Sequence, residues 1–399
     1  MGARIRIPPP LLWRGVRLPC RLVERPVTWL RRDHRAPAPI APQHLRKILV
    51  HAPNWLGDAV MSLPLLDHLR VTCSTASITI VSRPQCAGLW ELHPHVDEVI
   101  SFDGFDPNLT LSDIARFIRT VRDRAPDAVF ILPGGIEFAL FHTLAGTRTR
   151  VGYDFDHRRL FLTHPVRVPQ DFRARHLSES YLDLGRLVGP VTAARPRLRI
   201  APADGQGGSE MPYPHRAGSG HLRVLFHPWA TYGPAKRWPP ARFAELGERL
   251  AARFDAEIVL VGSEDARGVA AEIDRLMHRR TLDLTGRTSI AELCELMRGS
   301  AVMVSNDSGP AHLADALDLP LVVLFGSSSP PWTGPRGERS ETIYHALTCS
   351  PCFQRTCPLA TYACFDGITT DEVFDRVERL LAPSTASVAC PPAAASERP

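Results

Sequence analysis

V-S-N-D-S-G-P-A-H-L-A-D-A-L, residues 304–317, is the stretch of this sequence that decides the fold. The apolar run at 301–305 predicts a buried parallel strand, and the polar residues 306–309 predict a turn. Residues 310–317 are expected to form a helix, which begins with a proline whose missing N–H is no loss in the first turn. Residues 321–325 are the next apolar run and predict a second buried strand. Strand, turn, helix and strand in this order are typical of an open α/β sheet.

The polar turn in this stretch has the features of a ligand site. It follows a strand of the predicted sheet, and open α/β sheets bind ligands outside the carboxyl ends of their strands. The helix N-terminus at Gly309 offers free N–H groups and partial positive charge to a phosphate. His312 can add a donor, and Asp307 can accept hydrogen bonds from hydroxyls. The pattern indicates a phosphorylated, hydroxyl-rich ligand, with the alternative that Asp307 and Ser308 only cap the helix.

The charge of the chain is concentrated at its N-terminus. The 399 residues carry a net charge of +5, but residues 1–46 hold ten arginines against Glu24 and Asp33. That segment has a net charge of +8, so the other 353 residues carry −3. These 353 residues are nearly neutral and lack the basic surface typical of a nucleic-acid-binding protein, so no nucleic-acid partner is expected.

The sequence predicts neither a membrane span nor a secretion signal. No apolar run approaches the ~20 residues of a spanning helix, and prolines and arginines interrupt the apolar stretches near the N-terminus. Nine cysteines without a signal favour reduced thiols and a cytoplasmic location. Residues 1–45, rich in Arg and Pro, are expected to be a disordered extension. It is either dispensable or touches an anionic membrane surface through its arginines, Trp13 and Trp29.

Residues 46–201 predict a first parallel-sheet domain, because strands and helices alternate along them. The domain opens with a strand and a loop, and a helix then runs from Asp58 to about Arg70. The loop has one glycine in place of G-x-G-x-x-G, so a dinucleotide cofactor is not expected. The remaining segments are predicted strands at 48–51, 77–81, 98–102, 128–132, 152–153 and 161–162, and helices at 111–122, after Gly135 and at 176–188.

A second α/β pattern follows at residues 221–382, after a segment rich in Gly, Pro and Ser at 202–220 that predicts a linker. Residues 383–399 form an Ala/Pro/Ser tail that is expected to be disordered. Two similar halves around a linker predict a cleft between them. The second half is predicted to hold strands at 223–227, 257–261, 282–284, 301–305 and 321–325, and helices at 240–253, 266–278, 290–298, 311–317 and 370–381. The last helix could pack either on its own domain or back on the first.

Four loops that follow strands could face this cleft, and each carries a candidate residue. Asp58 follows the first strand and is either a general base or a helix-dipole partner. Lys236, in the loop 227–237, is one of two lysines against 45 arginines. Together with Thr231 it could hold a phosphate, or it could be an ordinary surface lysine. Glu264 and the turn 306–309 follow two further strands.

Four cysteines near the C-terminus form the pattern C-x2-C-x4-C-x6-C. One C-x-x-C pair followed by two looser thiols is compatible with a structural zinc or an iron–sulfur cluster. The spacing matches neither known framework, so packed or loop thiols are the alternative. The four residues are Cys349, Cys352, Cys357 and Cys364.

Four motifs of the chain resemble glycosyltransferase family 9, and within it the lipopolysaccharide heptosyltransferases of type II. They occur in the family's order, and the resemblance covers residues 46 to about 382. The cysteine segment also resembles one found in many bacterial members. The motifs are H-A-P-N-W-L-G-D-A-V-M-S-L-P-L-L, G-P-A-K-R-W-P, N-D-S-G-P-A-H-L-A-D-A-L and L-F-G-S-S-S-P-P-W-T-G-P.

This resemblance implies a GT-B architecture, in which two Rossmann-like domains face a cleft. It implies an inverting, metal-independent transfer of heptose from ADP-heptose to the inner core of lipopolysaccharide, with no cofactor required for catalysis. The donor is expected mainly on the second domain and the lipid A–Kdo–heptose acceptor on the first. The enzyme is expected to be cytoplasmic, with peripheral contact to the inner membrane surface. The absence of D-x-D near the cleft loops is consistent with a metal-free site.

The resemblance also assigns roles to single residues. It implies that Asp58 is the base that deprotonates the acceptor hydroxyl, and that Lys236, with Thr231 nearby, holds the diphosphate. Glu264 corresponds to an acidic ribose contact, and Thr288 falls near the nucleotide base. The remaining implied donor contacts, to the sugar and the phosphates, are Asp307, Ser308, Gly309 and His312.

Two alternatives remain open at the level of sequence. One is another GT-B enzyme, such as a nucleotide-sugar epimerase, which would release free sugar product without an acceptor. The other is a non-catalytic two-domain sugar-binding protein, which would bind ADP-heptose and never release ADP. The sequence departs from the family in Pro53-Asn54-Trp55, in the Arg-rich extension and in the insert at 202–220, which leaves the acceptor's identity open.

Overall fold

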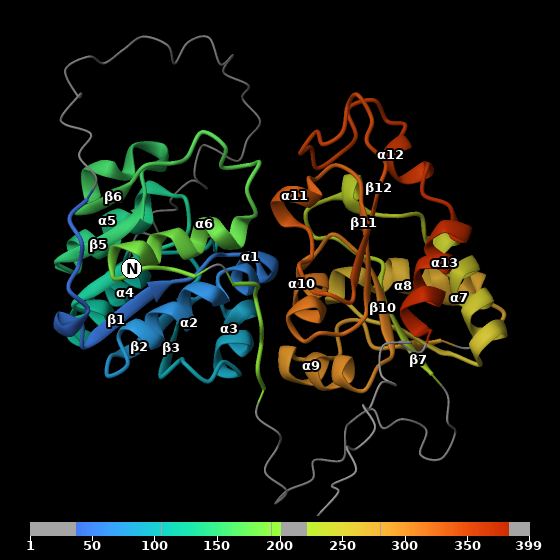
Figure 1. The fold of residues 1–399 in the computed structure, drawn as a ribbon, viewed down its shortest axis with the longest axis horizontal. Helices are drawn as coiled ribbons and strands as arrows, with labels where there is room; N and C mark the ends of the chain where they lie inside the picture. Colours follow the sequence, from blue (N-terminus) through green and yellow to red (C-terminus); the bar gives the residue numbers. More distant parts are fainter. Residues whose placement is uncertain (1–36, 105, 193, 201–221, 280, 383–399) are drawn as a thin grey trace, which may run out of the picture.

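Two six-stranded parallel sheets, one in each half of the chain, form the framework of the protein (Figure 1). The computed structural model describes residues 37–104, 106–192, 194–200, 222–279 and 281–382. The predicted linker at 202–220, the tail at 383–399 and the N-terminal extension up to residue 36 lie outside the described residues. The prediction of two α/β domains is confirmed.

The first sheet has the strand order β3-β2-β1-β4-β5-β6. All its neighbouring strands are parallel. Its central strands are buried on both faces, which explains why they read as apolar runs in the sequence. Its strands are β1 (Lys47–His51), β2 (Ser77–Ser82), β3 (Glu98–Ser101), β4 (Ala128–Ile131), β5 (Thr149–Tyr153) and β6 (His164–Val166). Its helices are α1 (Leu56–Met61), α2 (Leu63–Thr72), α3 (Pro84–Glu91), α4 (Leu111–Arg124), α5 (Ile136–Leu144) and α6 (Leu177–Asp183).

The second sheet repeats this topology in the order β12-β11-β10-β7-β8-β9. Its strands are β7 (Arg223–His227), β8 (Glu257–Leu260), β9 (Leu282–Asp283), β10 (Val302–Asn306), β11 (Leu321–Phe325) and β12 (Ser340–Tyr344). Its helices are α7 (Pro240–Phe254), α8 (Arg267–Leu276), α9 (Ile290–Arg298), α10 (Gly309–Ala316), α11 (Pro330–Thr333), α12 (Ala363–Asp366) and α13 (Thr370–Leu381). Among the described elements, the last helix, α13, packs on α7, β10 and β11 of this domain and not back on the first. In both sheets the strand order reverses beside the first strand of the domain, which is where such folds bind ligands.

Short 3-10 segments complete the described elements. They are η4 (Pro42–His44), η5 (Phe155–Phe161), η6 (Leu184–Leu187), η7 (Pro234–Lys236) and η8 (Glu264–Ala266). The segment η4 precedes β1. Leu45, the residue after η4, is buried, and the backbone N–H of Ile40 donates to Leu187 O at 2.7 Å. Residues 37–45 therefore pack on the first domain, although the sequence assigned them to the extension.

Three local predictions were wrong or incomplete. The helix expected from Asp58 to Arg70 is divided at Ser62, because Pro64 has no N–H to donate to the preceding turn. The strand expected at 161–162 is the end of η5, and the strand lies at β6 instead. Inside η5 the buried Arg158 donates to the carbonyls of Pro133 and Tyr153, which ties the segment to the sheet edge. The short elements α3, α11, α12 and β12 were not predicted from the sequence.

The two domains meet where α1 of the first faces α10 of the second (Figure 1). A side-chain carbon added to Gly57 would lie 2.7 Å from Cδ2 of His312, and one added to Gly309 would lie 2.9 Å from Cβ of Leu56. The two glycines thus allow the first turns of both helices to approach closely. This contact brings the ends of β1 and β10 to one place.

Candidate active site

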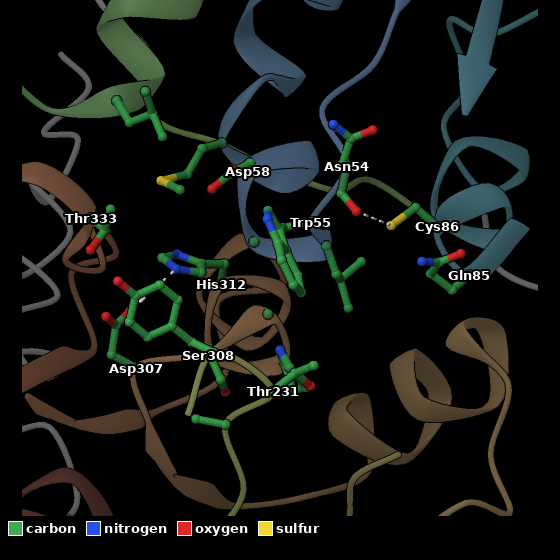
Figure 2. A pocket seen from close by; sticks show the side chains of 18 of the residues that line it. Asn54, Trp55, Asp58, Gln85, Cys86, Thr231, Asp307, Ser308, His312 and Thr333 are labelled. Atoms are coloured by element: carbon green, nitrogen blue, oxygen red, sulfur yellow. Dashed lines mark hydrogen bonds and ion pairs between the residues drawn. The ribbon is translucent and has the colours of Figure 1, made fainter. Parts of the chain in front are cut away.

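A cavity of about 840 Å³ lies between the two domains. It is lined by residues that follow β1 in the first domain and β7, β8, β9 and β10 in the second. Figure 2 shows Asp58 on the first-domain side and Asp307 and His312 on the other. The predicted site residues in the lining are Asp58, Thr231, Lys236, Thr288, Asp307, Ser308, Gly309 and His312.

Asp58 lies in the first turn of α1, and its side chain is partly buried in the cavity wall. Burial raises the pKa of its carboxyl group from 3.8 to about 6, and nearby Asp307 adds to the rise. The charges of His312 and Lys236 act in the opposite direction and lower the pKa. A carboxylate with a pKa near neutrality is suited to accept a proton during catalysis, since its conjugate acid still loses the proton at neutral pH.

Lys236 and Asp307 form a buried ion pair on the opposite wall. Nζ of Lys236 lies 2.5 Å from Oδ2 of Asp307, and His312 Nε2 lies 3.7 Å from Oδ1. The hydroxyl of Ser328 donates to the same Oδ2. Burial by itself would raise the pKa of Asp307, but the charges and hydrogen bonds of Lys236 and His312 hold it well below the usual range. Asp307 therefore stays ionised and fixes the ammonium group beside the N-terminus of α10.

Ser308 does not cap α10 with its side chain, although it is the N-cap residue. Its hydroxyl is 2.9 Å from Nδ1 of His227, whose pKa burial lowers to about 4. The Asp307 carboxylate is occupied by Lys236 and Ser328. Simple helix capping thus does not explain these two side chains, and Gly309 begins α10 at the cavity without a side-chain cap.

Tyr232 was not singled out in the sequence, and the structure places it in the cavity wall. Its ring centroid lies 5.0 Å from Nζ of Lys236 and 5.3 Å from Cζ of Arg355. Its hydroxyl donates to the Phe353 carbonyl at 2.6 Å. The sequence contains only a weak signal for Tyr232, which lies four residues before Lys236, because its contact with Phe353 joins positions 121 residues apart.

Residues 353–355 pack against the loop that carries Lys236. Ala235 N donates to Arg355 O at 3.0 Å, and Phe353 N donates to Ser327 O at 2.7 Å. Gly233 has φ of +151°, and a side-chain carbon there would lie 2.4 Å from Arg355 O. The glycine is therefore required by both its conformation and this close approach. The segment between Cys352 and Cys357 thus supports the position of Tyr232 and Lys236.

Glu264 is the one predicted site residue that the structure does not place in the cavity lining. Its side chain is 78% exposed and pairs with Arg267 at 3.2 Å. Its neighbours Ser263 and Asp265 line the cavity in its place. Thr288 and Thr231 do lie in the lining, on the second-domain side, as the sequence predicted.

The first-domain wall of the cavity contains several side chains that the sequence did not single out. Trp55 is 40% exposed, and Gln85 and Cys86 come from the unpredicted helix α3 (Figure 2). Burial raises the pKa of the Cys86 thiol to about 11, so it remains protonated. The remaining first-domain lining includes Asn54, Leu132, Tyr153, Phe155, Phe172 and Tyr181. An aromatic and amide surface of this kind suits a ligand with both apolar ring faces and hydroxyls.

The cysteine segment gives no support to the suggested zinc or iron–sulfur site. A tetrahedral metal site requires its ligand atoms to lie within about 4 Å of one another. Among the described residues, these cysteines do not form a group of three ligand atoms within 4.8 Å. All four are free thiols, namely Cys349, Cys352, Cys357 and Cys364.

Within the described part of the chain, no helix combines the length and the apolar character needed to cross a bilayer.

Comparison with known proteins gives a consistent result. The family model for glycosyltransferase family 9 (heptosyltransferase) matches residues 114–363, which is more than half of the 399-residue chain. The lipopolysaccharide heptosyltransferase 2 of Salmonella typhimurium is 29% identical over 309 residues, covering 74% of this chain and 87% of its own length. The lipooligosaccharide heptosyltransferase 2 of Haemophilus influenzae is 26% identical over 305 residues, with 74% and 88% covered.

Solved structures agree with these relatives. The ADP-heptose lipopolysaccharide heptosyltransferase II of Escherichia coli has a TM-score of 0.71 at 27% identity, covering 84% of this chain and 98% of its own. A family 9 glycosyltransferase of Veillonella parvula has a TM-score of 0.74 at 20% identity, covering 86% and 99%, and shows the fold alone. The expected GT-B architecture of two Rossmann-like domains is confirmed.

Proposed function

Because the chain belongs to glycosyltransferase family 9 and is a glycosyltransferase, we propose that it transfers heptose from ADP-heptose to the inner core of lipopolysaccharide, as a heptosyltransferase of type II. Type II relatives from several bacteria support this choice of donor and acceptor. The observation that carries the proposal is the placement of Asp58. This partly buried carboxyl group, with a pKa raised to about 6, lines a cavity between two domains together with Lys236 and His312.

The second-domain wall supports a nucleotide-sugar donor. Lys236 and the N-terminus of α10 offer positive charge to a diphosphate, and His312 adds a ring nitrogen beside them. Thr231 and Thr288 offer hydroxyls, and we assign Thr288 to the side of the nucleotide base. Asp265 is better placed than Glu264 to accept hydrogen bonds from ribose hydroxyls, because only Asp265 lines the cavity.

The first-domain wall supports the acceptor. Asp58 points into the cavity from this side (Figure 2), where Trp55 and Gln85 extend the surface around it. We assign this surface to the terminal heptose of the lipid A–Kdo–heptose acceptor. A lipid-linked acceptor also implies peripheral contact with the cytoplasmic face of the inner membrane.

The proposed step is a single displacement with inversion. The acceptor hydroxyl oxygen forms a bond to the anomeric carbon of heptose while the bond from that carbon to the diphosphate oxygen breaks. The hydroxyl proton passes to the Asp58 carboxylate, and ADP leaves with one more negative charge. Lys236, His312 and the α10 N-terminus stabilise this growing charge. We propose that these groups suffice without a catalytic metal ion.

The test is a reaction of the purified protein with ADP-heptose and a heptose-bearing inner-core acceptor, analysed by mass spectrometry and by ADP release. We expect one heptose to be added for each ADP released, and negligible ADP release without acceptor. Free sugar product in the absence of acceptor would favour the epimerase alternative. Binding of ADP-heptose with no turnover under any acceptor condition would favour a non-catalytic sugar-binding protein. Either outcome contradicts the proposal.

A further inference from the structure

Two histidines and an aspartate form a compact cluster on the first domain, outside the cavity just described. Asp67 lies on α2, and His93 and His95 lie in the turn that follows α3. One ligand atom of each residue lies within 4.8 Å of the other two. None of the three lines the cavity between the domains. The proposed glycosyl transfer leaves this cluster without a role.

The distances within the cluster match those of a metal site. Zinc bonds to imidazole and carboxylate measure ~2.0–2.2 Å, so neighbouring ligand atoms of a tetrahedral site lie roughly 3.3–3.5 Å apart. Asp67 Oδ1 is 2.9 Å from Nδ1 of His95 and 3.6 Å from Nε2 of His93. Small side-chain adjustments would therefore bring all three atoms to coordination distance of one ion.

Hydrogen bonding alone does not account for this arrangement. Nδ1 of His95 is buried, and its 2.9 Å contact with the Asp67 carboxylate is the only contact of Asp67 with the two rings that lies within hydrogen-bond distance. The 3.6 Å separation between Asp67 and His93 Nε2 is too long for a hydrogen bond. The two imidazole planes are inclined by 73°, with centroids 5.3 Å apart, so the rings do not stack. A cation between the three atoms would satisfy all of them.

The backbone around the cluster is fixed, which favours a preformed site. Arg70, one turn after Asp67 on α2, donates to His95 O at 2.9 Å and to Asp97 at 2.7 Å. The backbone N–H of His93 donates to Trp90 O, and that of Val96 donates to His93 O, both at 3.1 Å. The side chains of His95 and Asp67 are 33% and 42% exposed, which leaves a coordination position open to water.

We propose that Asp67, His93 and His95 bind a dication of the zinc class, with two imidazole nitrogens, one carboxylate oxygen and water as ligands. The bound ion would join α2 to the turn after α3. Its role is structural, since the cluster lies apart from the reacting groups. This site is also distinct from the cysteine segment of the second domain.

Two local interactions oppose the ion. Nδ1 of His93 accepts a long hydrogen bond of 3.3 Å from the backbone N–H of His95, and metal binding through Nε2 would replace it with a protonated Nδ1. Burial raises the pKa of Asp67 overall, while His95 and then Arg199 act to lower it. The positive charge of Arg199 repels a cation. The Arg199→Gln variant should therefore bind the metal more tightly than the wild-type protein.

The test is titration of the metal-free full-length protein with Zn²⁺ by calorimetry and with Co²⁺ by visible absorption. We expect saturable binding that chelator reverses and that raises the melting temperature. His95→Ala and the isosteric Asp67→Asn should weaken the affinity by more than about 10-fold. His164→Ala, which removes a partly buried histidine elsewhere in this domain, should leave it unchanged.

Control experiments separate this site from the cysteines and from chance binding. A Cys352→Ser/Cys357→Ser variant should keep the cobalt spectrum of nitrogen and oxygen ligands. Intense sulfur-to-cobalt absorption that is lost in that variant, with no effect of His95→Ala, would place the metal on the cysteines. Affinity unchanged by His95→Ala and Asp67→Asn would indicate an adventitious ion only. Either result, or the absence of saturable binding, overturns the proposal.

Discussion

The ammonium group of Lys236 lies 2.5 Å from Oδ2 of Asp307, and both side chains are largely withdrawn from solvent. Asp307 also accepts a hydrogen bond from Ser328, so its carboxylate is held on two sides. The lysine is therefore placed and its charge balanced before any ligand enters. A diphosphate that binds at the N-terminus of α10 meets a cation that need not be ordered first, which lowers the entropic cost of binding.

The Lys236→Ala variant should bind ADP roughly 10- to 100-fold more weakly, because a hydrogen bond to a charged group contributes about 1.5–3 kcal/mol. It should also lose stability, since the buried Asp307 carboxylate would lose its ammonium partner and keep only Ser328 and His312. Breaking a buried ion pair in this way costs about 3–5 kcal/mol. Calorimetry with ADP and a denaturation curve measure the two effects. Lys47→Ala, which removes the other lysine of the chain, is the matched control and should bind ADP normally. Normal ADP affinity in Lys236→Ala would show that the diphosphate does not lie there.

The Tyr232→Phe variant tests whether residues 353–355 position the lysine. It keeps the ring beside Lys236 and removes only the hydrogen bond to Phe353 O. Loss of one such bond should weaken ADP binding roughly 2- to 10-fold. In the Lys236→Ala background the same change should have almost no further effect, because the two residues act through one ammonium group.

Additive losses in this double-mutant cycle would show that Tyr232 acts independently of Lys236. Tyr344→Phe is the control for the loss of a tyrosine hydroxyl, since that group contacts Ser350 and not the Lys236 loop. Its ADP affinity should equal that of the wild-type protein.

A neighbouring pair of acidic residues tests the assignment of the ribose contact. Asp265 lines the cavity and Glu264 does not. Asp265→Ala should therefore weaken ADP binding about 10-fold, through the loss of hydrogen bonds to a charged group. Glu264→Ala should have little effect, because its exposed ion pair with Arg267 contributes at most ~1 kcal/mol to stability. The reverse order of effects would mean that the loop after β8 rearranges when the donor binds.

The burial of each strand explains whether its position could be predicted from the sequence. The apolar runs predicted β1, β4, β7, β10 and β11 well, because strands buried on both faces are apolar throughout. The edge strand β12 was missed, since only one of its five residues is buried. Its sequence therefore has no clear hydrophobic signal.

The candidate site was predictable where residues lie in the segments that leave the carboxyl ends of strands. Asp58, Lys236 and Asp307 lie in such segments after β1, β7 and β10, and parallel strands bring their carboxyl ends to one edge. The position of the Tyr232 side chain depends on its hydrogen bond to Phe353, and that of Asp307 on its hydrogen bond from Ser328. No local sequence pattern reveals either contact. The choice between Glu264 and Asp265 depends on the side-chain direction in a 3-10 turn.

Asp58 should limit the stability of the folded protein. Its pKa is about 6 in the folded state against 3.8 ordinarily, so the folded state binds the proton more tightly. The contribution of Asp58 to the free energy of unfolding is fully present below pH 3.8 and is lost as the pH rises through 6. The total loss is about 3 kcal/mol. Asp58→Asn should therefore be more stable than the wild-type protein at pH 7.5, and the difference should shrink towards pH 4. Denaturant titrations at the two pH values measure it, and a variant less stable at pH 7.5 would contradict the assigned pKa.

The most direct test of the account is the effect of Asp58→Asn on turnover and on ADP binding, measured on the same preparation. We predict that kcat for acceptor-dependent ADP release falls by ~10²–10⁴-fold, the contribution of a general base, while ADP affinity changes little. In the wild-type protein kcat should rise with pH and reach half of its plateau value near pH 6, as the Asp58 carboxyl group ionises. If Asp58→Asn keeps wild-type turnover, or loses ADP affinity in proportion to its rate, Asp58 is not the base and the proposed division between the two domains is wrong.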